Sequence, residues 1–447
     1  MQIYLYSNSM TVSSTDKVTD AQTILHTNSQ GDWTYAAPRL YPHQWLWDSC
    51  FIAIGISTYS PLRAANELLS LRRGQWANGM LPHIIFSDAP DYWLGPEFWQ
   101  SHKAPYAPRH IETSGITQPP VLAIAAKTIA DRLDSTRRKR FLEEIYPVII
   151  KYHTWLFTER IHQGTLLQLI HPWESGLDNT PPWMYLLKQY HTSPHSITPP
   201  GALQHVYPVR KDLRVVAKNQ RPTNGDIHRM VDLALMYRLA DYQSKHILNK
   251  PLIAVEDLTF NVLAVRASDA LEEIAAYLGV SLPPIIKKGH KQLINIFPEL
   301  WDAKAGEFFS RDSKTKKLIS QTSIATFLPL YAGLATEEQA ATLVKQLKNT
   351  DTYGAPYPVP TTSMASSYFS EERYWQGPIW VNMNWLILQG LEKYGFYREA
   401  KDLRTKTIQL IESKGFYEYF SPLTGAPAGA GNFSWTAALY LELLSNN

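Results

Sequence analysis

The sequence has one cysteine, Cys50, among its 447 residues, which excludes an intramolecular disulfide and favours a reducing compartment. It also has no uninterrupted apolar run of about 18 residues, the length that a membrane-spanning helix needs. Residues 1–20 lack the basic and apolar segments of a signal peptide. These absences predict a soluble cytoplasmic protein with no membrane partner.

Several catalytic and ligand-binding motifs are missing too. The 14 histidines are scattered without an HExxH pattern, which gives no support to a zinc hydrolase. Walker A, GxGxxG and GxSxG patterns are absent, so nucleotide binding and a serine-hydrolase elbow are not expected. Cys50 lies in an apolar helical run and is interpreted as core. We therefore expect neither a metal nor a cofactor.

Positively and negatively charged residues are nearly equal in number. Lys and Arg number 43 and Asp and Glu 40, a formal net charge of +3. This balance offers no electrostatic reason for a nucleic-acid partner. Aromatic residues, in contrast, reach 12%, with 14 Trp and 25 Tyr. Most should pack in the core, but their clustering beside acids, amides and glycine is typical of carbohydrate sites.

Apolar residues recur at helical spacing along most of the chain, and strand-like alternation is rare. About twelve helices are expected, which indicates six helical hairpins closed into an (α/α)6 barrel. A superhelical repeat array is the alternative, but no fixed repeat period supports it. The predicted helices cover residues 48–58, 61–73, 119–131, 136–160 with a break near Pro147, 226–245, 256–279, 284–298, 322–334, 336–349, 378–394, 397–413 and 433–445.

Two long insertions interrupt this helical pattern, at about residues 74–118 and 179–223. Their tryptophans and prolines predict ordered, non-helical caps over the mouth of a single catalytic domain, residues 1–447. Residues 301–320 are expected to form a short hairpin with its turn at 312–314. Thr336 and Gln339 fit a capping box at a helix start.

The segment HPWESGLDNTPPW, residues 171–183, is the strongest candidate for chemistry. It holds Glu174 and Asp178 near Trp173 and Trp183, and its glycine and paired prolines predict a rigid loop. A carboxyl group beside an aromatic wall has a raised pKa and suits a general acid. We assign that role to Asp178 and expect Glu174 to brace the loop. The residues alone leave the reverse assignment open.

A second acidic candidate is Glu418, within GFYEYFSPLTG at residues 415–425. A loop bounded by glycines and rich in aromatics is a poor place for a surface charge and a good place for a base that activates water. Trp435 could pack behind it or belong to the core. Our hypothesis is that Asp178 and Glu418 face each other across a glycosidic bond.

Two further segments offer polar groups beside aromatic residues. In PHQWLWDS, Trp45 and Trp47 precede Asp48, which is either a helix N-cap or an acceptor for sugar hydroxyls. Gln118 stands before a predicted helix and either caps it or binds a sugar hydroxyl. The densest cluster is YWQGPIWVNMNW, where Ile379 and Trp385 are expected in the core. Its other members, Tyr374, Trp375, Gln376 and Trp380, are expected to contact a ligand.

These segments resemble glycoside hydrolase family 63, and within it the mannosylglycerate and glucosylglycerate hydrolases. QWLWDS, ETSGITQPP, WESGLDNTP, YWQGPIWVNMNW and GFYEYFSPLTG occur in family order from residue 43 onward. The resemblance implies an (α/α)6 barrel, inversion of configuration, Asp178 as acid and Glu418 as base. It also implies a sugar pocket lined by Trp47, Asp48, Gln118, Trp173, Gly176, Tyr374, Trp375, Gln376 and Trp380.

Related enzymes recognise the carboxylate of glycerate, and a planar guanidinium suits that task. The second insertion offers Arg210, Arg214 and Arg221, of which at least two should be solvated loop residues. The expected reaction is release of glucose or mannose from a small α-glycoside, glucosylglycerate or mannosylglycerate. The alternatives are an α-glucosidase acting on disaccharides or short oligosaccharides and a carbohydrate-binding toroid without turnover. The sequence leaves open whether the chain forms a homo-oligomer.

Overall fold

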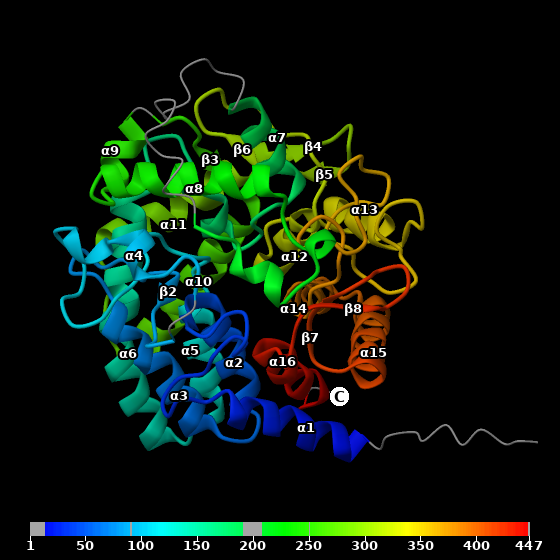
Figure 1. The fold of residues 1–447 in the computed structure, drawn as a ribbon, viewed down its shortest axis with the longest axis horizontal. Helices are drawn as coiled ribbons and strands as arrows, with labels where there is room; N and C mark the ends of the chain where they lie inside the picture. The colour runs from blue at the N-terminus through cyan, green and yellow to red at the C-terminus, as the bar shows by residue number, and fades with distance from the viewer. Residues whose placement is uncertain (1–13, 90–91, 191–207, 250, 446–447) are drawn as a thin grey trace, which may run out of the picture.

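The computed structural model describes residues 14–89, 92–190, 208–249 and 251–445 (Figure 1). Within them, six helices form a closed inner ring, because each packs against the next and the last packs against the first. All eleven residues of the first ring helix are buried, as expected for a helix that neighbours enclose on every side. The ring helices are α2 (Leu46–Ile56), α5 (Leu122–Arg132), α10 (Leu258–Leu278), α12 (Leu328–Ala332), α14 (Val381–Lys393) and α16 (Ser434–Ser445).

A second set of six described helices lies outside this ring. Five of them follow a ring helix along the chain, and the sixth, α1, packs against α16. The (α/α)6 barrel predicted from apolar spacing is thus confirmed. The outer helices are α1 (Ser14–Thr27), α3 (Pro61–Ser70), α6 (Ser135–Glu159), α11 (Pro284–Ile296), α13 (Glu337–Lys348) and α15 (Tyr397–Lys414).

The helices differ from the prediction in three places. Helix α1 was not expected, although it completes the outer ring. The helix predicted at 226–245 exists as α8 (Asn224–Leu239), but it packs against the insertions and not in the barrel. The break expected at Pro147 is also wrong, because α6 runs through this residue. The capping box of Thr336 and Gln339 is present as predicted.

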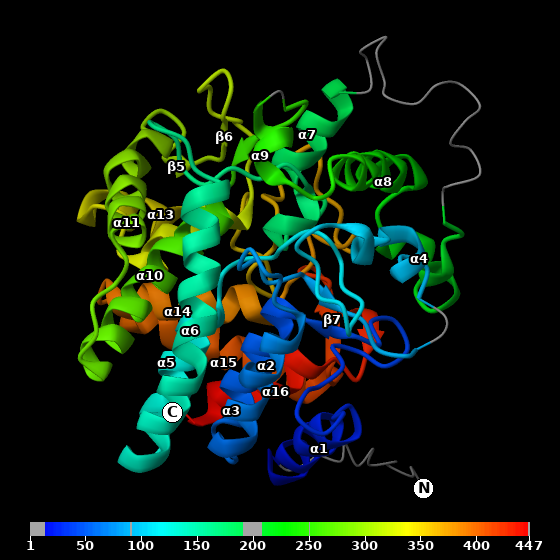
Figure 2. The ribbon, with the colours of Figure 1, turned by 90° about the vertical axis from the view of Figure 1, so that its left-hand side faces the viewer.

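The insertions contain more helix than expected. The first includes the short helix α4 (Pro96–Trp99), and the second begins with α7 (Pro181–Tyr190). We expected the paired prolines to belong to a rigid loop, but they open α7, where their missing N–H groups need no partner. Residues 191–207 of the second insertion lie outside the described part of the chain. Helices α4, α7 and α8 lie together in the upper half of Figure 2, above α2 and α3.

Four two-stranded antiparallel sheets accompany the described helices. Residues 301–320 turn back on themselves twice. Strands β4 and β5 form a first hairpin that we did not expect, and Arg311 bridges Leu318 around a turn that begins at Asp312, as predicted. Strand β6 also pairs with β3. Glu418 lies in strand β7, not in the loop that we expected. The sheets are β1 (Gln44–Trp45) with β2 (Ile84–Ile85), β3 (Val255–Glu256) with β6 (Arg311–Asp312), β4 (Trp301–Asp302) with β5 (Glu307–Phe308), and β7 (Tyr417–Phe420) with β8 (Pro427–Gly431).

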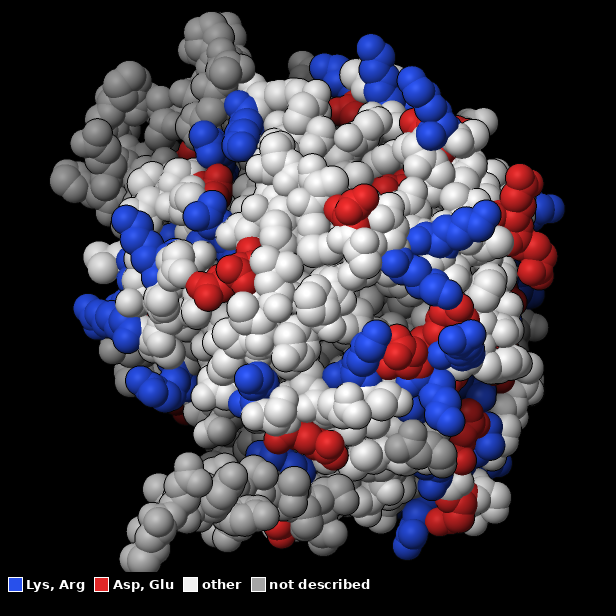
Figure 3. Space-filling view, turned by 90° about the vertical axis from the view of Figure 1, so that its right-hand side faces the viewer, with Lys and Arg blue, Asp and Glu red and all other residues white. Residues whose placement is uncertain are grey.

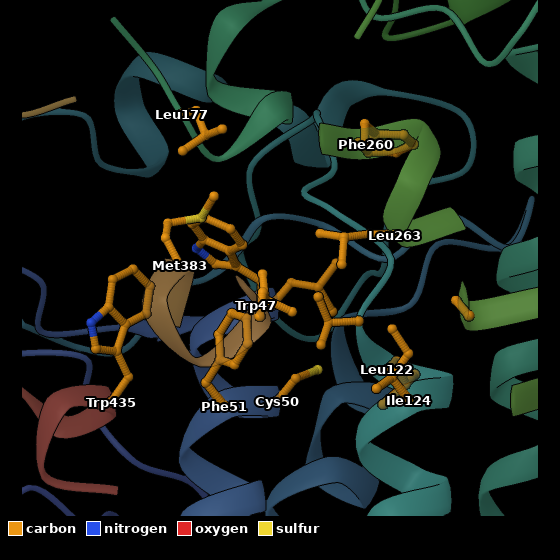
Figure 4. Close-up of a cluster of buried hydrophobic side chains, with 14 of the residues drawn as sticks. Trp47, Cys50, Phe51, Leu122, Ile124, Leu177, Phe260, Leu263, Met383 and Trp435 are labelled. Carbon is orange, nitrogen blue, oxygen red and sulfur yellow. The ribbon is translucent and has the colours of Figure 1, made fainter. Parts of the chain in front are cut away.

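The core fills the inside of the ring, where side chains from several ring helices meet (Figure 4). Cys50 is buried there beside Phe51, as expected. On the outside, one face carries basic and acidic side chains intermixed around a largely uncharged centre (Figure 3). No helix among the described residues is long and apolar enough to cross a membrane.

Candidate active site

A cavity opens at the end of the barrel where several ring helices begin. Trp47 and Asp48 lie in the first turn of α2, Trp380 is the N-cap residue of α14, and Trp435 lies in the first turn of α16. The space between the atoms, counted out into the open solvent at the mouth, is about 840 Å³. Helix N-termini carry partial positive charge, which favours carboxylates in such a position.

Most of the residues predicted from the sequence line this cavity, although the segments that carry them are far apart in the chain. Asp178 and Glu418 both belong to the lining, as does Arg221 from the second insertion. The other predicted residues found in the lining are Trp45, Trp47, Asp48, Gln118, Trp173, Gly176, Tyr374, Trp375 and Trp380.

Asp178 follows the 3-10 helix η3 (Pro172–Ser175) and its side chain is partly exposed to the cavity. Burial raises the pKa of Asp178 to about 7, against the opposing effects of Arg221 and a hydrogen bond with Tyr374. The next residue, Asn179, accepts a hydrogen bond of 2.9 Å from the backbone N–H of Trp375. The loop that carries Asp178 is therefore tied to the segment that carries the aromatic wall.

Glu418 is 1% exposed, and both of its carboxylate oxygens have partners. Oε1 accepts a hydrogen bond of 2.9 Å from the Tyr41 hydroxyl and lies 3.6 Å from Nη1 of Arg221. Oε2 accepts a hydrogen bond of 2.9 Å from the backbone N–H of Ala430. Burial raises the pKa of Glu418, while Arg221, Ala430 and Tyr41 act in the opposite direction. This carboxyl group is thus buried but held beside a cation and two donors.

Arg221 is the arginine of the second insertion that reaches the cavity. Its Nη1 donates a hydrogen bond of 2.7 Å to the hydroxyl of Tyr41, and its guanidinium lies 4.3 Å from the centre of the Tyr374 ring. Its Nε lies 3.3 Å from Asp212, a second carboxylate in the lining. The charge of Arg221 is therefore shared between Glu418 and Asp212.

Three residues predicted to bind substrate lie elsewhere, and the reason is the direction of each side chain. Gln376 is buried but does not line the cavity. Arg210 turns away from it and forms two hydrogen bonds, of 2.7 and 2.6 Å, with Asp212. Arg214 is exposed at the surface and is likewise absent from the lining.

Glu174, the alternative acid, lies outside the cavity lining and is fully buried. Its Oε2 accepts hydrogen bonds from Arg160, from the Tyr237 hydroxyl and from the backbone N–H groups of Ile170 and His171. Glu174 thus braces the loop, as we expected. This position leaves Asp178 as the one acid of the pair with access to the cavity.

The aromatic wall is formed by close stacking. The rings of Trp375 and Trp380 are parallel within 6° with centroids 3.7 Å apart, and Trp380 Nε1 donates to the carbonyl of Tyr374. Gly176 has φ +74°, and a Cβ atom there would collide with the ring of Trp47. A flat apolar surface of this kind suits the apolar face of a sugar ring.

Asp48 and Gln118 provide polar groups beside this wall. Asp48 lies inside the first turn of α2. The interpretation of Asp48 as the N-cap residue is therefore wrong, because Trp45 occupies that position. Burial raises the pKa of Asp48, and the carboxyls of Glu418 and Asp178 raise it further. Gln118 accepts a hydrogen bond of 3.3 Å from the backbone N–H of Trp47, so its amide NH₂ can still donate to a ligand.

Several lining residues were missed from the sequence, among them Tyr41, His83, Tyr92, Trp99 and Asp212. Tyr41 stands shortly before the segment of Trp45 and Trp47, and that proximity is a signal that could have found it. The others lie in the insertions, where aromatics and charges are too frequent to distinguish lining residues. No group of three potential metal ligands occurs among the described residues.

Comparison with known proteins identifies the family of this chain. Residues 41–436 match the mannosylglycerate hydrolase MGH1-like glycoside hydrolase domain. The chain is 35% identical to the mannosylglycerate hydrolase of Rubrobacter radiotolerans, over 96% of this chain and 97% of that protein. It is 33% identical to the glucosylglycerate hydrolase of Mycolicibacterium hassiacum, over 94% and 96% of the two chains.

A solved structure is similar over nearly the same length. The family 63 mannosylglycerate hydrolase of Thermus thermophilus, crystallised with Tris and D-glycerate, superposes with a TM-score of 0.86 at 35% identity. The alignment covers 95% of this chain and 99% of that one. The chain therefore belongs to the mannosylglycerate hydrolase MGH1-like branch of glycoside hydrolase family 63 and is a hydrolase of O-glycosyl bonds.

Proposed function

We propose that this enzyme hydrolyses an α-glycoside of glyceric acid, mannosylglycerate or glucosylglycerate, with inversion at the anomeric carbon. The observation that carries the proposal is the convergence of Asp178, Glu418 and Arg221 on one aromatic cavity. The two hydrolases compared above bear the names of these substrates, which supports the same substrate class here.

Asp178 is the general acid in this proposal. With a pKa of about 7 it retains a proton over much of the neutral range and can transfer it to the glycosidic oxygen as the bond breaks. Glu418 is the general base, which accepts a proton from the water that attacks the anomeric carbon. Arg221 stabilises the charged form of Glu418, as a base requires. Trp375 and Trp380 support the sugar ring, and Asp48 and Gln118 bind its hydroxyls.

Arg221 is proposed to recognise the glycerate carboxylate. It is the one arginine of the three predicted candidates that lines the cavity, and charge-assisted hydrogen bonds to a carboxylate are stronger than neutral ones. Asp212 and Tyr374 hold the guanidinium from two directions, which limits its freedom before substrate binds.

One observation favours a second candidate, an α-glucosidase acting on neutral disaccharides. Arg221 already contacts Glu418 and Asp212, so part of its charge is compensated without substrate. A neutral sugar in place of glycerate would need only hydroxyl partners, which Tyr92 and His83 could offer from the cavity wall. The two candidates differ in their dependence on a substrate carboxylate.

A matched pair of substrates separates these candidates. Glucosylglycerate and glucosylglycerol differ in one carboxylate, and we expect kcat/KM to be about 100-fold or more higher for the acid. Mannosylglycerate, trehalose and kojibiose complete the series. Equal rates on the matched pair, or faster hydrolysis of trehalose or kojibiose, would support the α-glucosidase instead.

Variants assign the discrimination to a residue. Arg221→Met should reduce the preference for glucosylglycerate over glucosylglycerol, whatever it does to the absolute rates. Arg214→Met removes an exposed arginine of the same insertion and should leave the preference unchanged. Inversion is tested by NMR during hydrolysis, where the β anomer of the free sugar should appear first.

A further inference from the structure

Two arginines of the second insertion share the carboxylate of Asp212, and they hold it unequally. Arg210 donates from Nε to Oδ1 over 2.7 Å and from Nη2 to Oδ2 over 2.6 Å. Arg221 donates from Nε to Oδ2 over 3.3 Å. A short bidentate pair between arginine and carboxylate is stronger than one longer contact. Arg210 therefore compensates most of the negative charge of Asp212.

Further contacts fix Arg210 in this orientation. Its Nη1 donates hydrogen bonds of 3.2 Å to the carbonyl oxygen of Pro222 and to Oδ1 of Asn224. Its guanidinium also lies 5.4 Å from the centre of the ring of Trp93, a residue of the first insertion. All three side-chain nitrogens of Arg210 thus donate to protein acceptors. Arg210 is a partner of Asp212 and not a group that binds substrate.

The position of Asp212 decides how much positive charge Arg221 retains for a substrate. The side chains of Asp212 and Arg221 are only 1% and 8% exposed, so water screens their attraction weakly. Without Arg210, the Asp212 carboxylate could turn both oxygens toward Arg221 and form a bidentate pair there. A substrate carboxylate would then meet a guanidinium that the protein has already neutralised. It would also meet the charge of Glu418, whose Oε1 lies 3.6 Å from Nη1 of Arg221.

We propose that Arg210 is a positioning residue for substrate selection, which occupies Asp212 and so leaves the charge of Arg221 available to a substrate carboxylate. This inference rests on the proposed function, in which Arg221 recognises glycerate. It also explains why a carboxylate lies beside an arginine that binds an anion. Asp212 orients Arg221 through its Nε, and Arg210 prevents Asp212 from cancelling the charge.

The test measures kcat/KM for glucosylglycerate and for glucosylglycerol on the same preparation and takes the ratio of the two. A loss of folded enzyme lowers both values equally, so the ratio reports recognition of the carboxylate. Arg210→Met should reduce this ratio about tenfold or more, because Asp212 then pairs with Arg221. Arg210→Lys keeps the charge but not the bidentate geometry, and its ratio should lie between the two. Arg214→Met, at an exposed arginine of the same insertion, is the matched control and should keep the wild-type ratio.

A second substitution separates charge compensation from a purely structural role. When Asp212→Asn is added to Arg210→Met, no carboxylate remains to neutralise Arg221. The ratio should then return to within about threefold of the wild-type value, a strongly non-additive result. Two substitutions that merely damage the insertion would leave the ratio low. If thermal unfolding shows that Arg210→Met does not fold, Arg210→Lys with and without Asp212→Asn provides the same comparison.

The possible failures can be told apart. A wild-type ratio in Arg210→Met, or a double variant whose ratio stays as low as that of Arg210→Met, would overturn the role of Arg210 while Arg221→Met still loses the preference. A wild-type enzyme with no preference for glucosylglycerate, or Arg221→Met that retains the preference, would place the failure in the proposed function, and the role of Arg210 would fail with it.

Discussion

The backbone N–H of Ala430 donates a hydrogen bond of 2.9 Å to Oε2 of Glu418. Ala430 lies in a β-bulge of strand β8 that faces Glu418. Tyr417 pairs with Gly431 and Tyr419 with Ala428, so two residues of β8 lie opposite Glu418 alone. Such bulges alter the direction of the strand and often lie beside active sites. Here the bulge turns a backbone donor toward the carboxylate that we propose as the base.

Gly429, the first residue of the bulge, should tolerate no side chain. Its φ is +72°, and a Cβ atom would collide with Oε2 and Cβ of Glu418. We expect Gly429→Ala to lower kcat/KM about tenfold or more, because the carboxylate would shift and general-base catalysis depends on its position. The left-handed conformation should also destabilise the fold by about 1–2 kcal/mol. Enzyme kinetics and thermal unfolding measure the two effects.

Gly431 provides the control on the same strand. It lacks a positive φ, and a Cβ atom there would lie 3.4 Å from the nearest atom, in Tyr417. Gly431→Ala should therefore keep most of the activity. If both alanine variants behave alike, the bulge does not position Glu418.

Removal of either proposed catalytic carboxylate should abolish most turnover without removing the binding site. Asp178→Asn and Glu418→Gln keep the shape of each side chain but cannot transfer a proton, and kcat should fall by about 10²–10⁴. Calorimetric titration with substrate should still detect binding. Asp402→Asn, on the exposed side of α15, makes the same chemical change outside the cavity and should retain full activity. Wild-type kcat in either variant would transfer its role to another group.

Glu174 should behave differently, because it stabilises the loop and does not reach the cavity. Glu174→Gln leaves the guanidinium of Arg160 buried without its partner, 3.0 Å from where the carboxylate was. Breaking a buried ion pair in this way typically costs about 3–5 kcal/mol. We expect a clear fall in the unfolding midpoint, whereas Asp178→Asn should not cause one. Unchanged thermal stability with complete loss of turnover would identify Glu174 as catalytic instead.

Eleven helices of the barrel were predictable because apolar residues recur along them at helical spacing or, as in α2, fill the whole helix, but the remaining one was not. Helix α1 is largely polar, and its place in the outer ring depends on contacts with α16 at the other end of the chain. Conversely, α8 has the spacing of a barrel helix but packs with α4 and α7. Local periodicity identifies a helix, and only tertiary contacts determine which layer it joins.

The site was predictable where aromatics and acids cluster within one segment. Trp47, Asp178, Trp380 and Glu418 stand in such segments and line the cavity. Side-chain direction was not predictable, which is why Gln376 is outside the lining although its neighbours are inside it.

Side-chain direction also decides which of the three candidate arginines reaches the cavity. Arg210 and Arg221 both pair with Asp212, a carboxylate that nothing in the local sequence distinguishes. Burial would raise the pKa of Asp212, but the hydrogen bonds and charges of these two arginines lower it. Which arginine then faces the cavity follows from the fold of the insertion and not from its composition.

The same proton that Asp178 needs for catalysis should make the enzyme less stable at higher pH. Burial raises its pKa from 3.8 to about 7, so between these values the folded protein binds a proton that the unfolded chain has lost. The stabilisation from this group is therefore complete at low pH and disappears as pH rises toward 7. Asp178→Asn carries no such proton. Its unfolding midpoint, relative to that of the wild type at the same pH, should therefore rise from about pH 4 to pH 7 and then level off.

Activity should follow the same titration, with wild-type kcat/KM falling above about pH 7 as the acid ionises. Thermal unfolding and initial rates over this range measure both effects, and a midpoint difference independent of pH would mean that Asp178 does not hold the proton.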